Sequence, residues 1–418
     1  MNTPAHTNDF DPDSLLKLAA DNPLPSLLTE ESDNERQQRE AEEQHEEEIS
    51  KILGRLKEQS KPLGGAEDYR KTPDKRPMLL VSDPPHGDIH TDPIDFLPQG
   101  KVGFFVAPGG TGKTQALVQL AIAVASGYKW LNTFYSPTGP ARVLLALGEE
   151  DRAEFRRRIN PLVDAMCHQL EASDKKDGRR LAGKLLADLQ ANLTELPLDC
   201  IKSRLIGPKS PKSGECPETP FFDALCQYVG ITLDEQRQPK PTPGFSKGFS
   251  LIILDPASRF MGPDCETDNA AATSFIQCVE VLTRAPNTPT VILAHHTRKG
   301  SGTGSGKDAA RGASALTDGA RWSAQLIRER KDDGTYKPDI KMFLDKSNYT
   351  PLIEPITLRF PEDRKKPWLE RVNAEEEPEK KPKTRPSDKR GRSATDAKKP
   401  KKKPSRTEEP NFTEDDWT

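Results

Sequence analysis

The stretch VGFFVAPGGTGKTQALVQLAIAVA, residues 102–125, predicts a strand, a glycine-rich loop and a helix in direct succession. Its centre, APGGTGKT at residues 107–114, fits the phosphate-loop pattern with alanine in place of the first glycine. Gly109, Gly110 and Gly112 allow the backbone to curl so that consecutive N–H groups face a phosphate. The N-terminus of the following helix adds a positive dipole end. The stretch therefore predicts a phosphate-binding loop in an α/β fold.

Two side chains at the end of this loop have the chemistry that a nucleoside triphosphate needs. We expect Lys113 to reach the β- and γ-phosphates and the Thr114 hydroxyl to ligate Mg²⁺. The predicted ligands are therefore ATP and Mg²⁺, and the competing interpretation is a glycine-rich turn with an exposed lysine. The residues predicted to contact the nucleotide are Pro108, Gly109, Gly110, Thr111, Gly112, Lys113, Thr114 and Gln115.

Composition sets limits on the rest of the chain. The 418 residues are only 33% hydrophobic, with 38 prolines and 30% charged residues, so part of the chain is expected to be disordered. The six cysteines form no C-x-x-C pair, which favours scattered thiols over disulfides or a zinc site. No apolar run is long enough to cross a bilayer, and the first residues lack the pattern of a signal peptide. We therefore expect a cytoplasmic protein with no membrane partner.

Residues 1–90 are acidic and contain no periodic core pattern, so we predict a mostly disordered region with short helices. Leucines gather in residues 11–28, which predicts either a docking peptide or a transient helix without a partner. Ten acidic residues against two arginines occupy positions 30–48, and four apolar residues at helical spacing follow them: Ile49, Ile52, Leu53 and Leu56. This pattern favours one exposed charged helix whose apolar stripe is too short for a coiled coil.

Residues 91–365 carry acidic side chains at two predicted strand ends. The strand 142–147 runs into Gly148-Glu-Glu-Asp151 and then into a helical pattern over 152–170. Because ligands bind at the carboxyl ends of parallel strands, Glu150 is a candidate base for activating water, and Glu149 is the alternative. Helix capping by acids is the competing interpretation. The apolar strand 249–255 ends in Asp255, which we expect to hold the water shell of Mg²⁺ opposite Thr114.

The predicted strand 290–296 ends in two histidines, and a polar glycine-rich loop follows. His296 is the candidate sensor of the γ-phosphate, against a structural histidine or, less favoured, a metal ligand. Basic side chains without aromatics in and after the loop predict contact with a nucleic-acid backbone, against a plain flexible linker. These basic residues are Arg298, Lys299, Lys307 and Arg311.

The remaining segments predict a hairpin, an insertion and a tail. Strand patterns over 321–327 and 340–344 flank a turn at Asp332-Asp-Gly334, and a further strand covers 356–360. The loop-rich range 172–248 predicts an insertion outside the core. Residues 366–418 predict a disordered tail in which 380–406 carry a net charge of +11 before an acidic tip. Such an arm favours salt-dependent DNA binding, with a solubilising tail as the alternative.

The combined motifs resemble the RepA-like hexameric replicative helicases of plasmids and phages, a branch of the RecA-like ATPases, over residues 90–360. The motifs that carry the resemblance, in order, are APGGTGKT (107–114), LGEED (147–151), IILDPASR (252–259), AHHT (294–297), RGASALTDGARW (311–322) and KSNY (346–349). The resemblance implies a RecA-like P-loop core with a mostly parallel sheet and a homo-hexameric ring with ATP between subunits. It further implies Glu150 as catalytic glutamate, His296 as sensor and Arg321 as the arginine finger, with Arg311 as the rival for that role.

We therefore expect an ATP-dependent DNA helicase or translocase that acts on single-stranded DNA in the replication of a plasmid, phage or mobile element. The alternative is a RecA- or RadA-like, ATP-dependent recombination or assembly factor that binds DNA without unwinding it. A third possibility is an adaptor whose core only regulates docking through the tails. The complete set of Lys113, Glu150 and Asp255 disfavours this adaptor.

Overall fold

The computed structural model describes residues 33–60, 70–72, 74–84, 92–174, 176–198, 200–296, 314–331, 333–361 and 368–372. A nine-stranded sheet with the order β14-β13-β12-β11-β3-β10-β9-β5-β6 forms its centre. The strands of this sheet are β3 (Val102–Ala107), β5 (Val143–Leu147), β6 (Leu193–Pro197), β9 (Leu251–Asp255), β10 (Thr290–His296), β11 (Trp322–Arg330), β12 (Tyr336–Ser347), β13 (Ile356–Arg359) and β14 (Glu370–Arg371).

Six neighbouring strands, from β11 to β6, are parallel, and β12, β13 and β14 continue the sheet antiparallel. The parallel strands β3, β5 and β9 are buried along their whole length. Such continuous apolar runs are typical of parallel strands that have helices on both faces. The expected α/β fold with a mostly parallel central sheet is thus confirmed.

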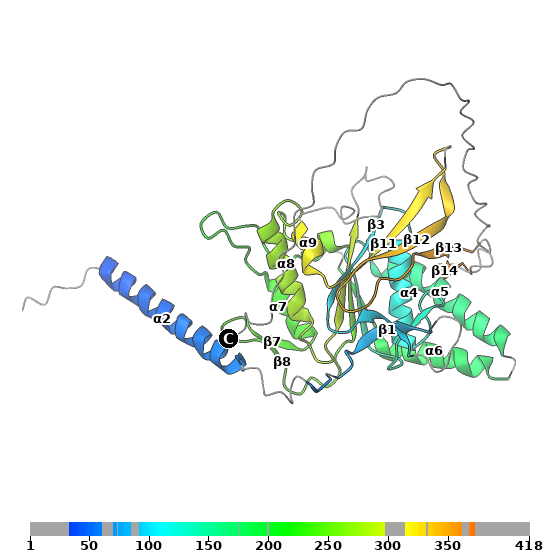
Figure 1. Cartoon of the computed structure of the whole chain (residues 1–418), viewed down its shortest axis with the longest axis horizontal. Helices are drawn as coiled ribbons and strands as arrows, with labels where there is room; N and C mark the ends of the chain where they lie inside the picture. The colour runs from blue at the N-terminus through cyan, green and yellow to red at the C-terminus, as the bar shows by residue number, and fades with distance from the viewer. Residues whose placement is uncertain are drawn as a thin grey trace, which may run out of the picture. The chain divides into compact units, whose positions relative to one another are not determined.

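Helices cover both faces of this sheet (Figure 1). One face carries α4 (Lys113–Ser126), α5 (Arg152–Ser173) and α6 (Gly178–Asn192). The other face carries α7 (Pro220–Tyr228), α8 (Asn269–Leu282), α9 (Ser314–Gly319) and the 3-10 turn η2 (Ala257–Arg259). Alternate residues of one strand enter the two cores, since Phe105 packs on the α4 side and Phe104 on the α8 side.

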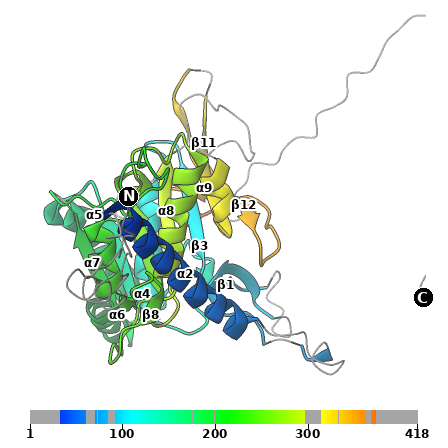
Figure 2. The ribbon, with the colours of Figure 1, turned by 90° about the vertical axis from the view of Figure 1, so that its left-hand side faces the viewer.

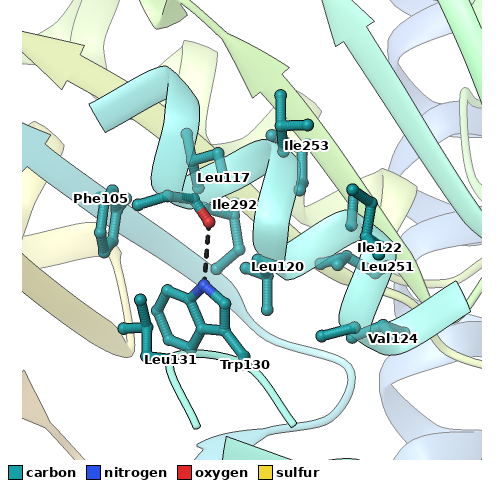
Figure 3. Close-up of a cluster of buried hydrophobic side chains, with 14 of the residues drawn as sticks. Phe105, Leu117, Leu120, Ile122, Val124, Trp130, Leu131, Leu251, Ile253 and Ile292 are labelled. Carbon is teal, nitrogen blue, oxygen red and sulfur yellow. Dashed lines mark hydrogen bonds between the residues drawn. The ribbon is translucent and has the colours of Figure 1, made fainter. Parts of the chain in front are cut away.

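Helix α4 is the deeply buried helix around which the first core is built. Its residues from Ala116 to Ala125 are almost all buried, and Gly127 ends it in a left-handed conformation. The Trp130 indole N–H donates to the carbonyl of Ala116 at 2.9 Å, drawn as the dashed line in Figure 3. Leu120, Ile253 and Ile292 pack around the same cluster. The cluster fixes the helix that follows the phosphate loop against the sheet.

A second, three-stranded sheet precedes and flanks the phosphate-loop strand. It has the order β2-β1-β4, from β2 (Ile94–Pro98), β1 (Met78–Ser82) and β4 (Phe134–Tyr135). Phe96 stacks on Phe134 with ring centroids 3.7 Å apart and meets Trp322 edge-on at 5.5 Å. All five residues of β1 are buried. The compact unit accordingly begins at Arg76, earlier than residue 91, where the sequence places the start of the folded region.

The range 172–248, expected to be an insertion outside the core, contributes a strand to the central sheet. Strand β6 pairs in parallel with β5, and Leu185 and Leu189 of α6 enter the first core. The loops 207–217 and 236–247 are largely half-buried or exposed, as expected. A small pair of strands, β7 (Ile231–Leu233) and β8 (Pro239–Pro241), follows α7 in the chain.

The predicted hairpin is present and forms one wing of the sheet. Strands β11 and β12 pair antiparallel from Trp322↔Ser347 to Arg330↔Tyr336. The pairing of β11 with β3 ends at Gln325↔Val106, so the last five residues of β11 extend beyond β3. This projecting hairpin is visible in Figures 1 and 2.

The unit before residue 76 contains the helix α2 (Asp33–Gln59), which confirms the expected charged helix. Ion pairs one turn apart join its side chains, including Arg36 with Glu40 and Lys51 with Glu47. Its apolar residues stay about half exposed: Ile49, Ile52, Leu53 and Leu56. No helix in the described part of the chain is long and apolar enough to span a bilayer. The leucine cluster in 11–28 and the tail from residue 373 lie outside the described residues.

Candidate nucleotide site

The carboxyl ends of four parallel strands bring the predicted motifs together. In the sheet register, His296 of β10 lies beside Ala107, the first residue of the loop motif, and Leu147 of β5 lies beside Asp255 of β9. The Gly148 amide donates to the carbonyl of Asp255 at 2.8 Å. Segments far apart in the sequence therefore meet at one edge, where ligands of open α/β sheets bind.

The loop between β3 and α4 adopts the curled conformation that its glycines predict. Gly110 and Gly112 have φ angles of 76° and 99°, in the left-handed region that disfavours other residues. The Thr111 amide bonds back to the carbonyl of Pro108 at 3.3 Å. A Cβ at Gly112 would lie 3.1 Å from the ring of Phe360 and 3.6 Å from Leu369. Residues near the end of the described chain thus brace the phosphate loop from behind.

Lys113 and Asp255 form a buried pair at the mouth of this loop. Their Nζ and Oδ1 atoms are 3.5 Å apart, and each side chain is only 5% exposed. Neither Lys113 Nζ nor Asp255 Oδ2 has a hydrogen-bond partner among the described residues. Burial lowers the pKa of Lys113, and the charge of Asp255 opposes this shift. Buried charges without hydrogen bonds are costly, so the pair suits a site that phosphate oxygens and a cation complete.

These residues also fit the expected Mg²⁺. Thr114 is half-buried at the first turn of α4, and Asp255 lies at the neighbouring strand end with its buried Oδ2. A hydroxyl and a carboxylate are oxygen donors of the kind that Mg²⁺ takes beside phosphates and water. The donor set present therefore matches the metal.

Two neighbouring glutamates follow β5, and the structure gives them different surroundings. Glu149 is 55% exposed, with its Oε1 3.6 Å from Arg259 Nε. Glu150 is 13% exposed, with its Oε1 2.5 Å from Arg158 Nη2 of α5. Burial raises the pKa of Glu150, and the Arg158 guanidinium lowers it in part. Asp151, the third acid of the motif, caps α5 by accepting from the Glu154 amide at 2.7 Å.

His296 lies at the end of β10 beside the loop. Partial burial, followed by the charge of Lys113, lowers its pKa, so the imidazole is neutral at pH 7. The preceding His295 is 3% exposed and meets Phe104 edge-on on the α8 side of the sheet. The two histidines thus face opposite sides of the sheet, as the strand period predicts.

Arg321 lies at the other end of the sheet. Its amide donates to the carbonyl of Val102 at 2.9 Å, beside the first residue of β3. The six residues of β3 separate that point from the phosphate loop, a distance of about 17 Å at the usual strand rise. The structure therefore does not bring Arg321 to the loop of its own subunit. Arg298, Lys299, Lys307 and Arg311 lie outside the described residues.

Several residues around the site carry no recognisable sequence signal. Arg158 follows Glu150 by eight positions on a helix rich in arginines, and Arg259 follows Asp255 by four. Phe360 and Leu369 approach the loop only through the fold of the antiparallel wing. The spacing after a strand-end acid is the one feature that directs attention to Arg158 and Arg259, while nothing in the sequence indicates the other two.

The comparisons with known proteins agree with this geometry. The chain matches the AAA_25 family, described as an AAA domain, over residues 84–199 and 245–302. The folded core is a RecA-like P-loop domain. The match passes over residues 200–244, so α6 and β6 fall within the matched part, whereas α7, β7 and β8 do not. The segment outside the family pattern is therefore shorter than the expected insertion at 172–248.

Two solved structures are similar to the RecA-like core. A KaiC-like protein from the hyperthermophilic archaeon Pyrococcus horikoshii OT3 is 11% identical, with a TM-score of 0.38 over 72% of this chain and 100% of that chain. The ATPase domain of a helicase is 11% identical, with a TM-score of 0.41 over 66% of this chain and 86% of that chain.

Proposed function

We propose that this chain is an ATP-dependent DNA helicase or translocase of the RepA-like type that acts in the replication of a plasmid, phage or mobile element. The observation that carries the ATPase part is the buried Lys113–Asp255 pair at the mouth of the phosphate loop. Within the part of the chain that the structure describes, its Nζ and Oδ2 atoms lack hydrogen-bond partners. A pair arranged only for stability would have these atoms satisfied. The DNA part rests on the sequence motifs and on the basic segments.

The residues of the site divide the work of hydrolysis. The loop amides and Lys113 would hold the phosphates, and Thr114 and Asp255 would hold Mg²⁺, which neutralises charge on the phosphate oxygens. Glu150, with Glu149 as the alternative, would orient the attacking water and accept its proton, since a raised pKa brings a carboxylate closer to the operating pH. Neutral His296, beside Ala107, is positioned to report the γ-phosphate to the loop that follows it.

The assembly we propose is a homo-hexameric ring in which Arg321 reaches the ATP of a neighbouring subunit. Its place at the opposite end of β3 from its own phosphate loop supports a role in trans over one in cis. Mixing Arg321→Ala with Lys113→Ala subunits should restore hydrolysis at interfaces that combine an intact loop with an intact arginine. Mixed rings as inactive as either parent would transfer the role to Arg311.

We assign the DNA contacts to the basic residues after β10, namely Arg298, Lys299, Lys307 and Arg311, and to residues 380–406. Single-stranded DNA is the proposed partner, and the N- and C-terminal regions are proposed to dock other replication proteins. Cutting the chain after residue 373 should lower the salt dependence of DNA binding, because the segment with a net charge of +11 is lost, and should leave the core ATPase intact.

The second candidate function is a RecA- or RadA-like factor that assembles on DNA without unwinding it. The two functions share the same nucleotide site, so a strand-displacement assay on forked DNA with ATP separates them. We expect displacement, together with ATPase stimulation by single strands, and neither activity in Lys113→Ala. ATPase stimulation and filament formation without displacement would favour the assembly factor.

A further inference from the structure

The ion pair between Glu150 and Arg158 has an uneven geometry. Arg158 Nη2 lies 2.5 Å from Glu150 Oε1. Glu150 Oε2 and Arg158 Nε are both buried, and neither has a hydrogen-bond partner in the described ranges of the chain. Paired guanidinium and carboxylate groups often form two parallel hydrogen bonds. Here a single contact fixes one carboxylate oxygen and leaves the other with its full capacity to accept.

The neighbouring ion pairs of the same helix differ from this one. Arg157 and Glu154 pair at 2.8 Å on the helix surface, with side chains 69% and 44% exposed. Glu150 is 13% exposed and Arg158 38% exposed. An exposed pair contributes little to stability, whereas a largely buried carboxylate held by one oxygen has a defined orientation.

The surroundings of Glu150 oppose its ionisation except on the side of Arg158. Burial is the largest influence and raises the pKa, and the charges of Asp255 and Glu154 act in the same direction. Arg158 is the group that favours the charged carboxylate. The same contact therefore both orients Glu150 and keeps it in the form that accepts a proton.

We propose that Arg158 is a positioning residue, which holds Oε1 of Glu150 so that the free Oε2 faces the water that attacks ATP. This inference rests on the proposed function, because it requires Glu150 to be the base. Arg158 belongs to α5, and α5 packs on the first core through Phe155, Ile159 and Leu162. The guanidinium is therefore held by a rigid element, as precise orientation of a catalytic group requires.

The test compares Arg158→Gln and Arg158→Lys with the matched control Arg157→Gln. We expect Arg158→Gln to lower kcat by about 10²-fold, the effect of a misplaced reacting group, with KM for ATP unchanged. Arg158→Lys should recover part of kcat, because it restores a cation to Oε1. Arg157→Gln should match the wild type. Equal kcat in the two glutamine variants would overturn the proposal, as would a loss of affinity for a fluorescent ATP analogue or of melting temperature without rescue by lysine.

Glu150→Gln and Glu149→Gln distinguish failure of this proposal from failure of the base assignment. Hydrolysis at the wild-type rate in Glu150→Gln, with loss in Glu149→Gln, would remove Glu150 as the base and this inference with it. An inactive Glu150→Gln beside an unaffected Arg158→Gln would keep the base and reject only the role of Arg158. If both assignments hold, adding Arg158→Gln to Glu150→Gln should cause no further loss, since both changes act on one step.

Discussion

Charged side chains have opposite surroundings at the carboxyl ends of the parallel strands and in the β11–β12 wing. At the strand ends, Lys113, Asp255 and Glu150 are largely buried, and each has an atom without a partner among the described residues. In the wing, Lys337 pairs with Glu329 and Arg359 pairs with Asp339 near the surface. Unsatisfied buried charge lowers stability, so a fold retains it where a ligand completes it. The difference separates an edge arranged to bind from a wing that is complete in itself.

Removing Lys113 tests the binding edge most directly. We expect Lys113→Ala to reduce ATP hydrolysis by at least about 10³-fold, since a cation on the transferred phosphate contributes on that order. The variant should also lose the rise in melting temperature that ATP and Mg²⁺ produce in the wild type, because bound ligand stabilises only the folded form. Steady-state turnover and thermal melting with and without nucleotide measure both effects. Near-normal turnover would refute the phosphate-loop assignment.

Two glycines of the loop should respond differently to alanine. Gly110→Ala meets open space, so only the left-handed backbone costs free energy of unfolding, about 1–2 kcal/mol. Gly112→Ala places a Cβ 3.1 Å from Phe360 and adds about 1–3 kcal/mol of overpacking to the backbone cost. Denaturant unfolding without nucleotide gives the comparison. Equal destabilisation would mean that Phe360 does not brace the loop.

Asp345 is the exception in the wing and gives a pH-dependent prediction. It is the extra residue of β12 between the pairs Ala324↔Leu344 and Ser323↔Lys346, and burial raises its pKa to about 6. The folded state thus holds a proton that the unfolded state releases near pH 4, so Asp345 lowers stability as pH rises from about 4 to about 6 and throughout the range above. Asp345→Asn should therefore raise stability by about 1–2 kcal/mol at pH 8 and change it little at pH 4. A gain of the same size at both values would exclude titration as the cause.

An exposed pair of the wing should have the smallest effect. Lys337 and Glu329 are 48% and 57% exposed, so we expect Lys337→Ala to change the free energy of unfolding by less than about 0.5 kcal/mol. ATP turnover should not change. A large loss of turnover in this variant would show that the wing takes part in the site, and the comparison between the two regions would no longer hold.

Sequence patterns predict the strands and helices that carry local signals. Strand β5, helix α5 and strand β9 lie close to their expected ranges, and the strand-end acids meet as the parallel arrangement requires. Strand β1 is not anticipated, because its five apolar residues lie between proline-rich polar segments and their partners in β2 and β4 are distant in sequence. Strand β6 is mixed in composition and joins the sheet only at its edge.

The candidate site is predictable in its inner residues and not in their supports. A phosphate loop has a fixed spacing, so Lys113 and Thr114 are evident from the sequence. The contact of Arg158 with Glu150 depends on the direction in which α5 leaves the sheet, and no local pattern encodes that direction. The position of Arg321 relative to the loop likewise follows from the pairing of β11 with β3.

The brace behind Gly112 has a consequence for the order in which the molecule matures. Phe360 and Leu369 leave the ribosome after almost all of the rest of the core, yet they pack against a loop that belongs to its early part. A nascent chain can already contain the whole phosphate motif while the surface that supports it has not been synthesised. The capacity to capture nucleotide tightly should therefore arise late in translation, which would keep incomplete chains from engaging ATP before the rest of the domain exists.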